Sequence, residues 1–195
     1  CLDPGSSLMR GVSRTDAGVH ARAQCVAFDT TLDIPPRGWA LALARHLPTE
    51  IAVVRAARVS VGYDPRSVAR TKTYRYSVLQ SLVRDPFRSS FTWRIAERLN
   101  HQAMGEEAAL LIGEHDFRAF RAAGDPRLDT RRHILRAQVH PSAVDGLGLD
   151  IVVTGNRFLY KMVRIIAGTL VDVGRGRLRP GAVARALASG SRADL

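Results

Sequence analysis

The chain has 195 residues, of which 29 are lysine or arginine and 18 are aspartate or glutamate, so its formal net charge at pH 7 is +11. This length supports a buried core in one large domain or in two small ones. Two cysteines exclude a disulfide framework and a zinc site, and no apolar run predicts a membrane span or a signal peptide. We therefore expect a soluble cytoplasmic protein, or an organellar one if the source is eukaryotic.

Arginine carries nearly all of the positive charge, because Lys72 and Lys161 are the only lysines. Guanidinium groups bind phosphates and stack on bases, so the excess indicates nucleic acid or another polyanion as partner. The coding bias of a GC-rich genome is the alternative explanation. The arginines are spread along the whole chain, which does not separate the two.

Residues 1–82 are expected to form an N-terminal unit of short strands with one helix. Apolar and polar side chains alternate from Tyr74 to Val78, which is typical of a half-buried strand, and two prolines at 35 and 36 favour the start of a helix. We expect an irregular lead-in over residues 1–8, strands over residues 24–28, 51–59 and 71–79, and a helix over residues 36–46.

Residues 80–98 predict a connection, so we place a domain boundary there and expect a C-terminal unit over residues 83–195. The expected elements are a helix from a cap at Asn100 to residue 112, strands over residues 134–140 and 147–153, a long helix from a cap at Asn156 to residue 173, and a helix over residues 180–188. Neighbouring strands with helices between them indicate an α+β fold with antiparallel sheets.

Residues 13–21, with the sequence SRTDAGVHA, are the first candidate site. A carboxylate, Asp16, stands beside a flexible glycine, which indicates a loop that faces a ligand. A single carboxylate of this kind can serve as a nucleophile; alternatively, Asp16 is a turn residue that bonds its own backbone. His20 lies four residues on, but Thr15 and Gly18 disfavour the helix that a shared metal site would need, so we expect no metal.

Two further residues are candidates because their surroundings are unusual. Tyr74 lies on a predicted strand between the cations Lys72 and Arg75, so it could stack on a base; a core tyrosine is the alternative. Arg164 lies in the most apolar predicted helix, where a charge normally requires a partner. Alternatively, Arg164 lies on the polar side of that helix with its charge in water.

The motifs together resemble the TruA-type tRNA pseudouridine synthases. Residues 13–21 look like the signature of that family, with serine where glycine is usual. The sequence YDPR at residues 63–66, followed by YRY at residues 74–76, is similar to a second motif. Residues 158–174 look like a third, and residues 113–121 agree more weakly. Four motifs in the order of the family, over roughly residues 12–175, make this a specific resemblance.

The resemblance implies a role for each candidate residue. Asp16 would be the nucleophile, Tyr74 the aromatic side chain that packs on the target base, and Arg164 the partner that fixes the aspartate. Cationic and polar residues near the motifs would contact RNA: Arg14, His20, Arg66, Lys72, Arg75 and Lys161. The reaction calls for no metal or other cofactor, and sequence leaves open whether the aspartate attacks C1′ of the sugar or C6 of the uracil.

The resemblance also implies a substrate and an architecture. The substrate would be uridine at positions 38 to 40 of the tRNA anticodon arm. The fold would have two related, ferredoxin-like α/β halves that share an antiparallel sheet beside a central basic cleft, in a homodimer. The family has a strand, a Tyr-Asp-Gly motif and a helix before the signature loop, and a closing strand after the final helix. We expect the first half to be incomplete, so a catalytically inactive, tRNA-binding remnant is the alternative hypothesis.

Overall fold

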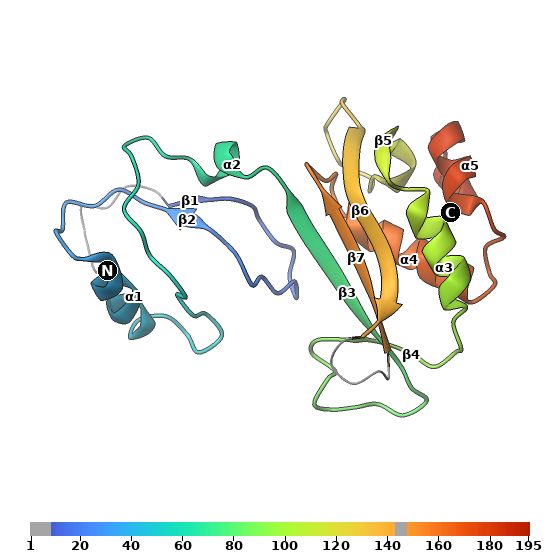
Figure 1. Cartoon of the computed structure of the whole chain (residues 1–195), viewed down its shortest axis with the longest axis horizontal. Coiled ribbons are helices and arrows are strands. Elements are labelled where there is room, and N and C mark those ends of the chain that lie inside the picture. The colour runs from blue at the N-terminus through green and yellow to red at the C-terminus, as the bar shows by residue number, and fades with distance from the viewer. Residues whose placement is uncertain (1–8, 143–147) are drawn as a thin grey trace. The chain divides into compact units, whose positions relative to one another are not determined.

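The computed structural model describes residues 9–142 and 148–195, so the expected lead-in over residues 1–8 lies outside the described residues. The chain divides into two compact units, Cys1–Arg70 and Thr71–Leu195, and each is described by itself. Figure 1 shows the helices and strands of both. The expected α+β composition is confirmed. The division near residue 82 into an N-terminal catalytic half and a related C-terminal half stays a prediction.

In the first unit, residues 9–70 as the structure describes them form two short strands and two helices. Strand β1 (Arg10–Gly11) pairs antiparallel with β2 (Val26–Ala27), inside the range expected for a strand. Helix α1 (Pro36–Ala44) confirms the predicted helix, with proline at its first position, and α2 (Pro65–Val68) is a single turn. The buried Trp39 of α1 packs edge-on against Phe28, with ring centroids 5.2 Å apart.

The strand expected over residues 51–59 is wrong, because this segment has no regular secondary structure. Its β-branched residues favour a strand, yet Ile51, Val54 and Val59 are 54%, 89% and 55% exposed. A strand is stabilised by a paired neighbour and by side chains packed on a buried face. Within the described part of the first unit no other strand pairs with this segment, so propensity alone does not order it.

The second unit is built on a five-stranded sheet with the order β4-β3-β7-β6-β5. Its strands are β3 (Lys72–Gln80), β4 (Trp93–Ile95), β5 (Gly113–Asp116), β6 (Arg131–Pro141) and β7 (Gly148–Gly155). The strands expected over residues 71–79, 134–140 and 147–153 are confirmed as β3, β6 and β7, although residue 147 lies outside the described residues. The sheet is mixed rather than purely antiparallel, because β4 runs parallel to β3.

The longer helices of this unit gather on one side of the sheet (Figure 1). They are α3 (His101–Ala109), α4 (Met162–Gly174) and α5 (Ala182–Ser189), and two 3-10 turns lie at Arg118–Phe120 and Arg192–Asp194. Ile166 and Leu170 of α4 are fully buried in one core with Ile151 of β7. No helix in the described part of the chain is long and apolar enough to cross a membrane.

The two predicted helix caps have different outcomes. Asn100 caps α3 as expected, since its side-chain oxygen accepts a hydrogen bond from Ala103 N at 3.1 Å. Asn156 does not cap α4, which begins six residues later at Met162. Its Oδ1 instead accepts hydrogen bonds from His133 N and Arg157 N, so it fixes the exit from β7. Residues 156 to 161, which we call the 156–161 turn, therefore separate β7 from α4.

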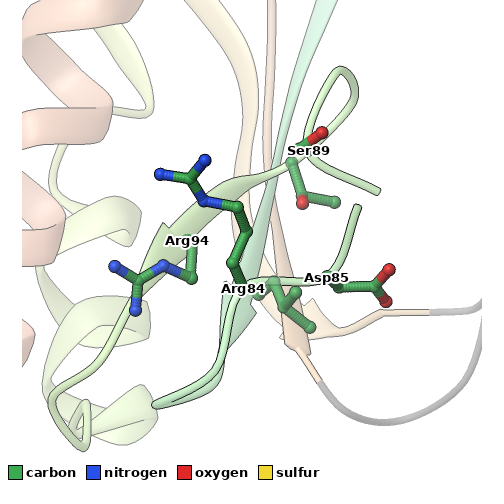
Figure 2. Close-up of a pocket in the computed structure, with 6 residues that line it drawn as sticks. Arg84, Asp85, Ser89 and Arg94 are labelled. Atoms are coloured by element: carbon green, nitrogen blue, oxygen red, sulfur yellow. The ribbon is translucent and has the colours of Figure 1, made fainter. Parts of the chain in front are cut away.

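The connection expected over residues 80–98 contains β4 and a hollow of about 260 Å³ (Figure 2). Its lining includes Arg84 and Arg94 together with Asp85 and Ser89. Arg94 Nη1 donates to the backbone carbonyls of Ser81 and Leu82, both at 3.2 Å, so this arginine braces the loop. None of the family-like motifs lies here, and we assign the hollow no role in the candidate site.

Replacing Glu107 with glutamine is expected to lower the free energy of unfolding by about 2 kcal/mol. The Glu107 side chain is almost fully buried and accepts backbone N–H groups of Gly181 and of Val183, the latter at 2.9 Å, at the start of α5. Glutamine offers only one acceptor oxygen, and its amide NH₂ faces a second donor. Urea denaturation measures the loss. Glu106→Gln, at an exposed site on the same helix, is the control and should change stability little.

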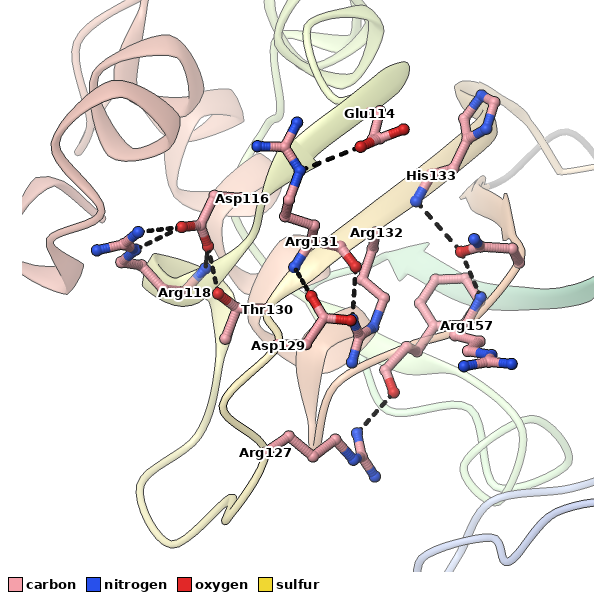
Figure 3. A network of polar contacts seen from close by, with 12 residues as sticks. Glu114, Asp116, Arg118, Arg127, Asp129, Thr130, Arg131, Arg132, His133 and Arg157 are labelled. Atoms are coloured by element: carbon pink, nitrogen blue, oxygen red, sulfur yellow. Dashed lines mark hydrogen bonds and ion pairs between the residues drawn. The ribbon is translucent and has the colours of Figure 1, made fainter.

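The Asp116→Asn variant is expected to be less stable than the unmodified protein, with the full loss above about pH 4 and a loss that fades as the pH falls to about 2. The Arg118 guanidinium, together with Thr130 and the Arg118 N–H, lowers the pKa of Asp116 to about 2 (Figure 3). Between pH 2 and 4 the unfolded chain binds the proton more readily, so this carboxylate stabilises the fold fully above that window and loses its effect through it. Solvent screening of the exposed Arg118 limits the effect to about 1 kcal/mol. The measurement is the free energy of unfolding as a function of pH. If its slope between pH 2 and 4 is the same for Asp116→Asn and for the unmodified protein, the lowered pKa of Asp116 is contradicted.

Candidate active site

The loop at residues 13–21 is held at both of its ends in the first unit. Val12 N donates to Cys25 O at 2.9 Å, which extends the β1–β2 pairing to the start of the loop. Gln24 Nε2 donates to Ser13 O at 2.6 Å from the other end. The loop is therefore a closed excursion between two short strands, as its content of glycine and polar residues predicts.

Asp16 lies at the exposed tip of this loop. Val19 N donates to Asp16 O at 3.1 Å, and Gly18 closes the turn with a φ of +78°, a backbone conformation that strains other residues. The side chains of Arg14, Asp16 and His20 are all exposed. In the residues that the structure describes, no histidine, cysteine, aspartate and glutamate side chains cluster as a metal site would require. Asp16 is therefore an exposed residue at a turn that is closed by a backbone hydrogen bond.

The YDPR motif supports this loop directly. The Asp64 side chain accepts from Arg66 N at 2.9 Å and so caps α2, while Arg66 Nε donates to Gly11 O at 3.1 Å. Arg66, expected from the sequence to contact RNA, therefore has a bond to the strand from which the Asp16 loop leaves. The spacing of 55 residues between Arg66 and Gly11 explains why no local pattern indicated this bond.

Tyr74 lies on β3 in the second unit and is half-buried against the core. Its ring packs edge-on against Phe158, with centroids 5.0 Å apart and planes at 79°. Such pairs are worth about 0.5–1.5 kcal/mol beyond the area that they bury. The β3 motif and the motif that begins at Phe158 are thus in contact. The core-tyrosine and the base-stacking interpretations both accommodate a half-buried ring.

Arg164 is an exposed residue on the first turn of α4. It lines a groove of about 310 Å³ together with Lys161 and Arg192, with one acidic residue, Asp172, and the apolar Ile165. Three cations and one carboxylate make the groove positive, which suits a phosphate or a carboxylate. The buried face of α4 includes Met162, Val163 and Ile166, and the exposed Arg164 is not part of it.

The other cations expected to contact RNA lie at different places in the second unit. Lys72 begins β3, and the exposed Arg75 points to the buried Asp150 with 3.8 Å between Nη1 and Oδ2. Lys161 places its ammonium over the ring of Tyr160, 4.9 Å from the centroid, and has a φ of +55°. Lys161 is thus placed in the groove by an unusual backbone conformation.

Sequence reasoning missed Asp125 and Arg127, which hold the 156–161 turn from outside. Asp125 Oδ2 accepts from Tyr160 N at 2.7 Å. Arg127 Nη1 donates to Phe158 O at 2.8 Å, and Figure 3 shows this bond at the labelled Arg127. Burial is the largest influence on the pKa of Asp125 and would raise it, but backbone hydrogen bonds from Tyr160 and Arg127 and the nearby arginines lower it overall. Asp125 follows glycine and precedes proline, which indicates only a turn.

Comparison with known proteins places the chain in a family. A family model described as tRNA pseudouridine synthase matches residues 108–195. The tRNA pseudouridine synthase A of Moorella thermoacetica is 42% identical over 179 residues, which cover 92% of this chain and 72% of that protein. The enzyme of the same name from Halalkalibacterium halodurans is 43% identical over 179 residues, with 92% and 67% covered. The chain therefore belongs to the tRNA pseudouridine synthase family of isomerases.

Proposed function

We propose that the protein isomerises uridine to pseudouridine in the anticodon arm of tRNA, at positions 38 to 40. The observation that carries this proposal is the 42% identity over 92% of the chain with a tRNA pseudouridine synthase A. A net charge of +11 suits a polyanionic substrate. The positions in the anticodon arm rest on the family resemblance of the motifs.

In the proposed reaction Asp16 is the nucleophile. The C1′–N1 bond breaks, the uracil turns without leaving, C5 bonds to C1′, and the proton from C5 is released as N1 is protonated. Attack of the carboxylate at C1′ or at C6 would each give a covalent adduct that is resolved in the same product. Substrate and product have the same composition, so no redox or group-donating cofactor is required.

The other two roles follow from the properties of the side chains. The target uridine must leave its stack, and the half-buried Tyr74, braced by Phe158, offers a ring of fixed orientation to pack on the extruded base. The Arg164 guanidinium would hold the Asp16 carboxylate by charge-assisted hydrogen bonds. These roles require the three side chains to act on the same uridine.

The RNA contacts are proposed at Arg14, His20, Lys72, Arg75 and Lys161. Arg66 has a structural contact, since its Nε donates to Gly11 O, and we propose that it holds the Asp16 loop in place as well as adding positive charge. We also propose a homodimer whose subunits each contain two related α/β halves beside a basic cleft. The resemblance to the family supports this architecture, and light scattering coupled to size exclusion measures the mass.

The experiment is to incubate the chain with an unmodified tRNA transcript that has uridine at positions 38 to 40, and to map pseudouridine by carbodiimide modification and primer extension. Stops at these positions in the presence of the protein support the proposal. Salt-sensitive tRNA binding without any product would instead identify a catalytically inactive, tRNA-binding member of the family. Product at positions outside the anticodon arm would contradict the assigned substrate site.

A further inference from the structure

The 156–161 turn lies between two of the side chains that we propose for the reaction, Tyr74 and Arg164. Its Phe158 packs on Tyr74, and its last residue, Lys161, leads directly into α4, on which Arg164 lies one turn further. Lys161 adopts a left-handed backbone conformation with a φ of +55°. For a residue with a Cβ this costs about 1 kcal/mol or more, so the surrounding structure must hold the turn in this conformation.

Asp125 and Arg127 provide that support from a segment that precedes β6. The Asp125 side chain is only 1% exposed, and its Oδ2 accepts from Tyr160 N at 2.7 Å while its Oδ1 accepts from Arg127 N at 3.1 Å. Ala122 N donates to Tyr160 O at 3.2 Å. The peptide groups on both sides of Tyr160, the residue before Lys161, are therefore bonded to this segment.

Arg127 adds a second attachment to the turn, at Phe158. Its Nη1 donates to Phe158 O at 2.8 Å and lies 3.5 Å from Asp125 Oδ2. Arg121 Nη1 in turn donates to Arg127 O at 2.7 Å. Because the Arg127 guanidinium is engaged with the turn and with Asp125, its geometry fits an internal brace better than an RNA contact.

We propose that Asp125, assisted by Arg127, is a positioning residue for the isomerisation: it fixes the 156–161 turn so that Tyr74 and Arg164 are presented in their reactive orientations. This inference rests on the proposed function. Small displacements of catalytic groups reduce turnover strongly while leaving most of the binding surface intact. A loss of the brace should therefore lower kcat much more than it weakens tRNA binding.

The test compares Asp125→Asn with Asp129→Asn in the full chain, using the unmodified tRNA transcript. Both variants remove one negative charge from the same segment, but the exposed Asp129 pairs with Arg132 and accepts from Arg131 N, so its bonds lead to β6 rather than to the turn. Asparagine at 125 cannot accept from both backbone groups, and its NH₂ opposes Tyr160 N–H. We expect kcat to fall about 10-fold in Asp125→Asn with a tRNA Kd within about 2-fold, and both values to stay within about 2-fold in Asp129→Asn.

A spectroscopic measurement separates positioning from a general loss of fold. 4-Fluorophenylalanine introduced at position 158 reports the ring contact with Tyr74, and its ¹⁹F resonance should move in Asp125→Asn but not in Asp129→Asn. If Asp125→Asn does not fold, Arg127→Lys retains the charge but cannot bridge the turn and Asp125 together, and should show the same pattern of loss.

The outcomes distinguish the two proposals. An unmodified chain that forms no pseudouridine overturns the proposed function and the positioning role with it. An active chain whose Asp125→Asn variant turns over as fast as Asp129→Asn overturns only the positioning role. A parallel loss of kcat and tRNA affinity, with an unchanged fluorine resonance, also contradicts it, because that result indicates an effect on RNA contacts.

Discussion

Replacing Asp16 with asparagine is expected to abolish pseudouridine formation, with turnover reduced by at least about 10³-fold. An amide has nearly the same shape as the carboxylate but is not a nucleophile, so the adduct with the uridine cannot form. Asp16 is exposed and Gly18 closes the turn, so we expect this nearly isosteric change to preserve the fold. The measurement is single-turnover formation of pseudouridine in the unmodified tRNA transcript.

The control for this variant is Asp33→Asn in the same unit. Asp33 is exposed and pairs with Arg58, far along the chain from the loop, and its replacement makes the same change in net charge. Turnover within about 2-fold of the unmodified protein is expected for Asp33→Asn, and tRNA binding should be retained in both variants. Asp16→Asn that keeps more than a tenth of the activity would refute the nucleophile assignment.

The sequence predicted those elements whose local pattern and long-range environment agree. β3 alternates polar and apolar side chains, and in the sheet it lies between β7 and β4 with one face on the core. The α3 helix begins at a residue, Asn100, whose side chain caps it as its chemistry favours. In such segments the local preference and the tertiary fold select the same structure.

The failures arise where long-range contacts decide. The segment at 51–59 has strand-forming residues but, within the described chain, no neighbouring strand, so it stays irregular. The long helix starts at Met162 rather than after Asn156, because Asn156 bonds His133 and because Asp125 binds the turn that follows. The partners of these two bonds lie 23 and 35 residues apart, so a local sequence pattern of helical or strand length does not contain both of them.

The candidate site shows the same division. Motif order identified the family and therefore proposed roles for Asp16, Tyr74 and Arg164, but it did not indicate what holds these residues. Arg66 bonds Gly11, and Asp125 bonds Tyr160, through backbone atoms that any residue type provides. Such contacts leave no signature in composition or periodicity, so only the structure shows them.

Replacing Arg164 with glutamine is expected to lower kcat about 10²-fold while changing the tRNA Kd by less than about 3-fold. The proposed role of Arg164 is to hold the nucleophilic carboxylate in line with its target, which matters in the transition state more than in binding. Glutamine retains part of the aliphatic stem but lacks the charge and the paired donors of the guanidinium. The measurement is the dependence of single-turnover rate on protein concentration.

Lys161→Gln supplies the comparison, because Lys161 lines the same groove as Arg164 and lies one turn before it. If Lys161 contacts a phosphate, its loss should weaken tRNA binding, reduce the slope of log Kd against log salt by about 1, and leave kcat nearly unchanged. Opposite kinetic effects of the two substitutions would separate a residue that acts on the aspartate from one that binds RNA. If the two variants instead behave alike, Arg164 is a solvated cation on the polar side of α4, and the aspartate must be held by another group.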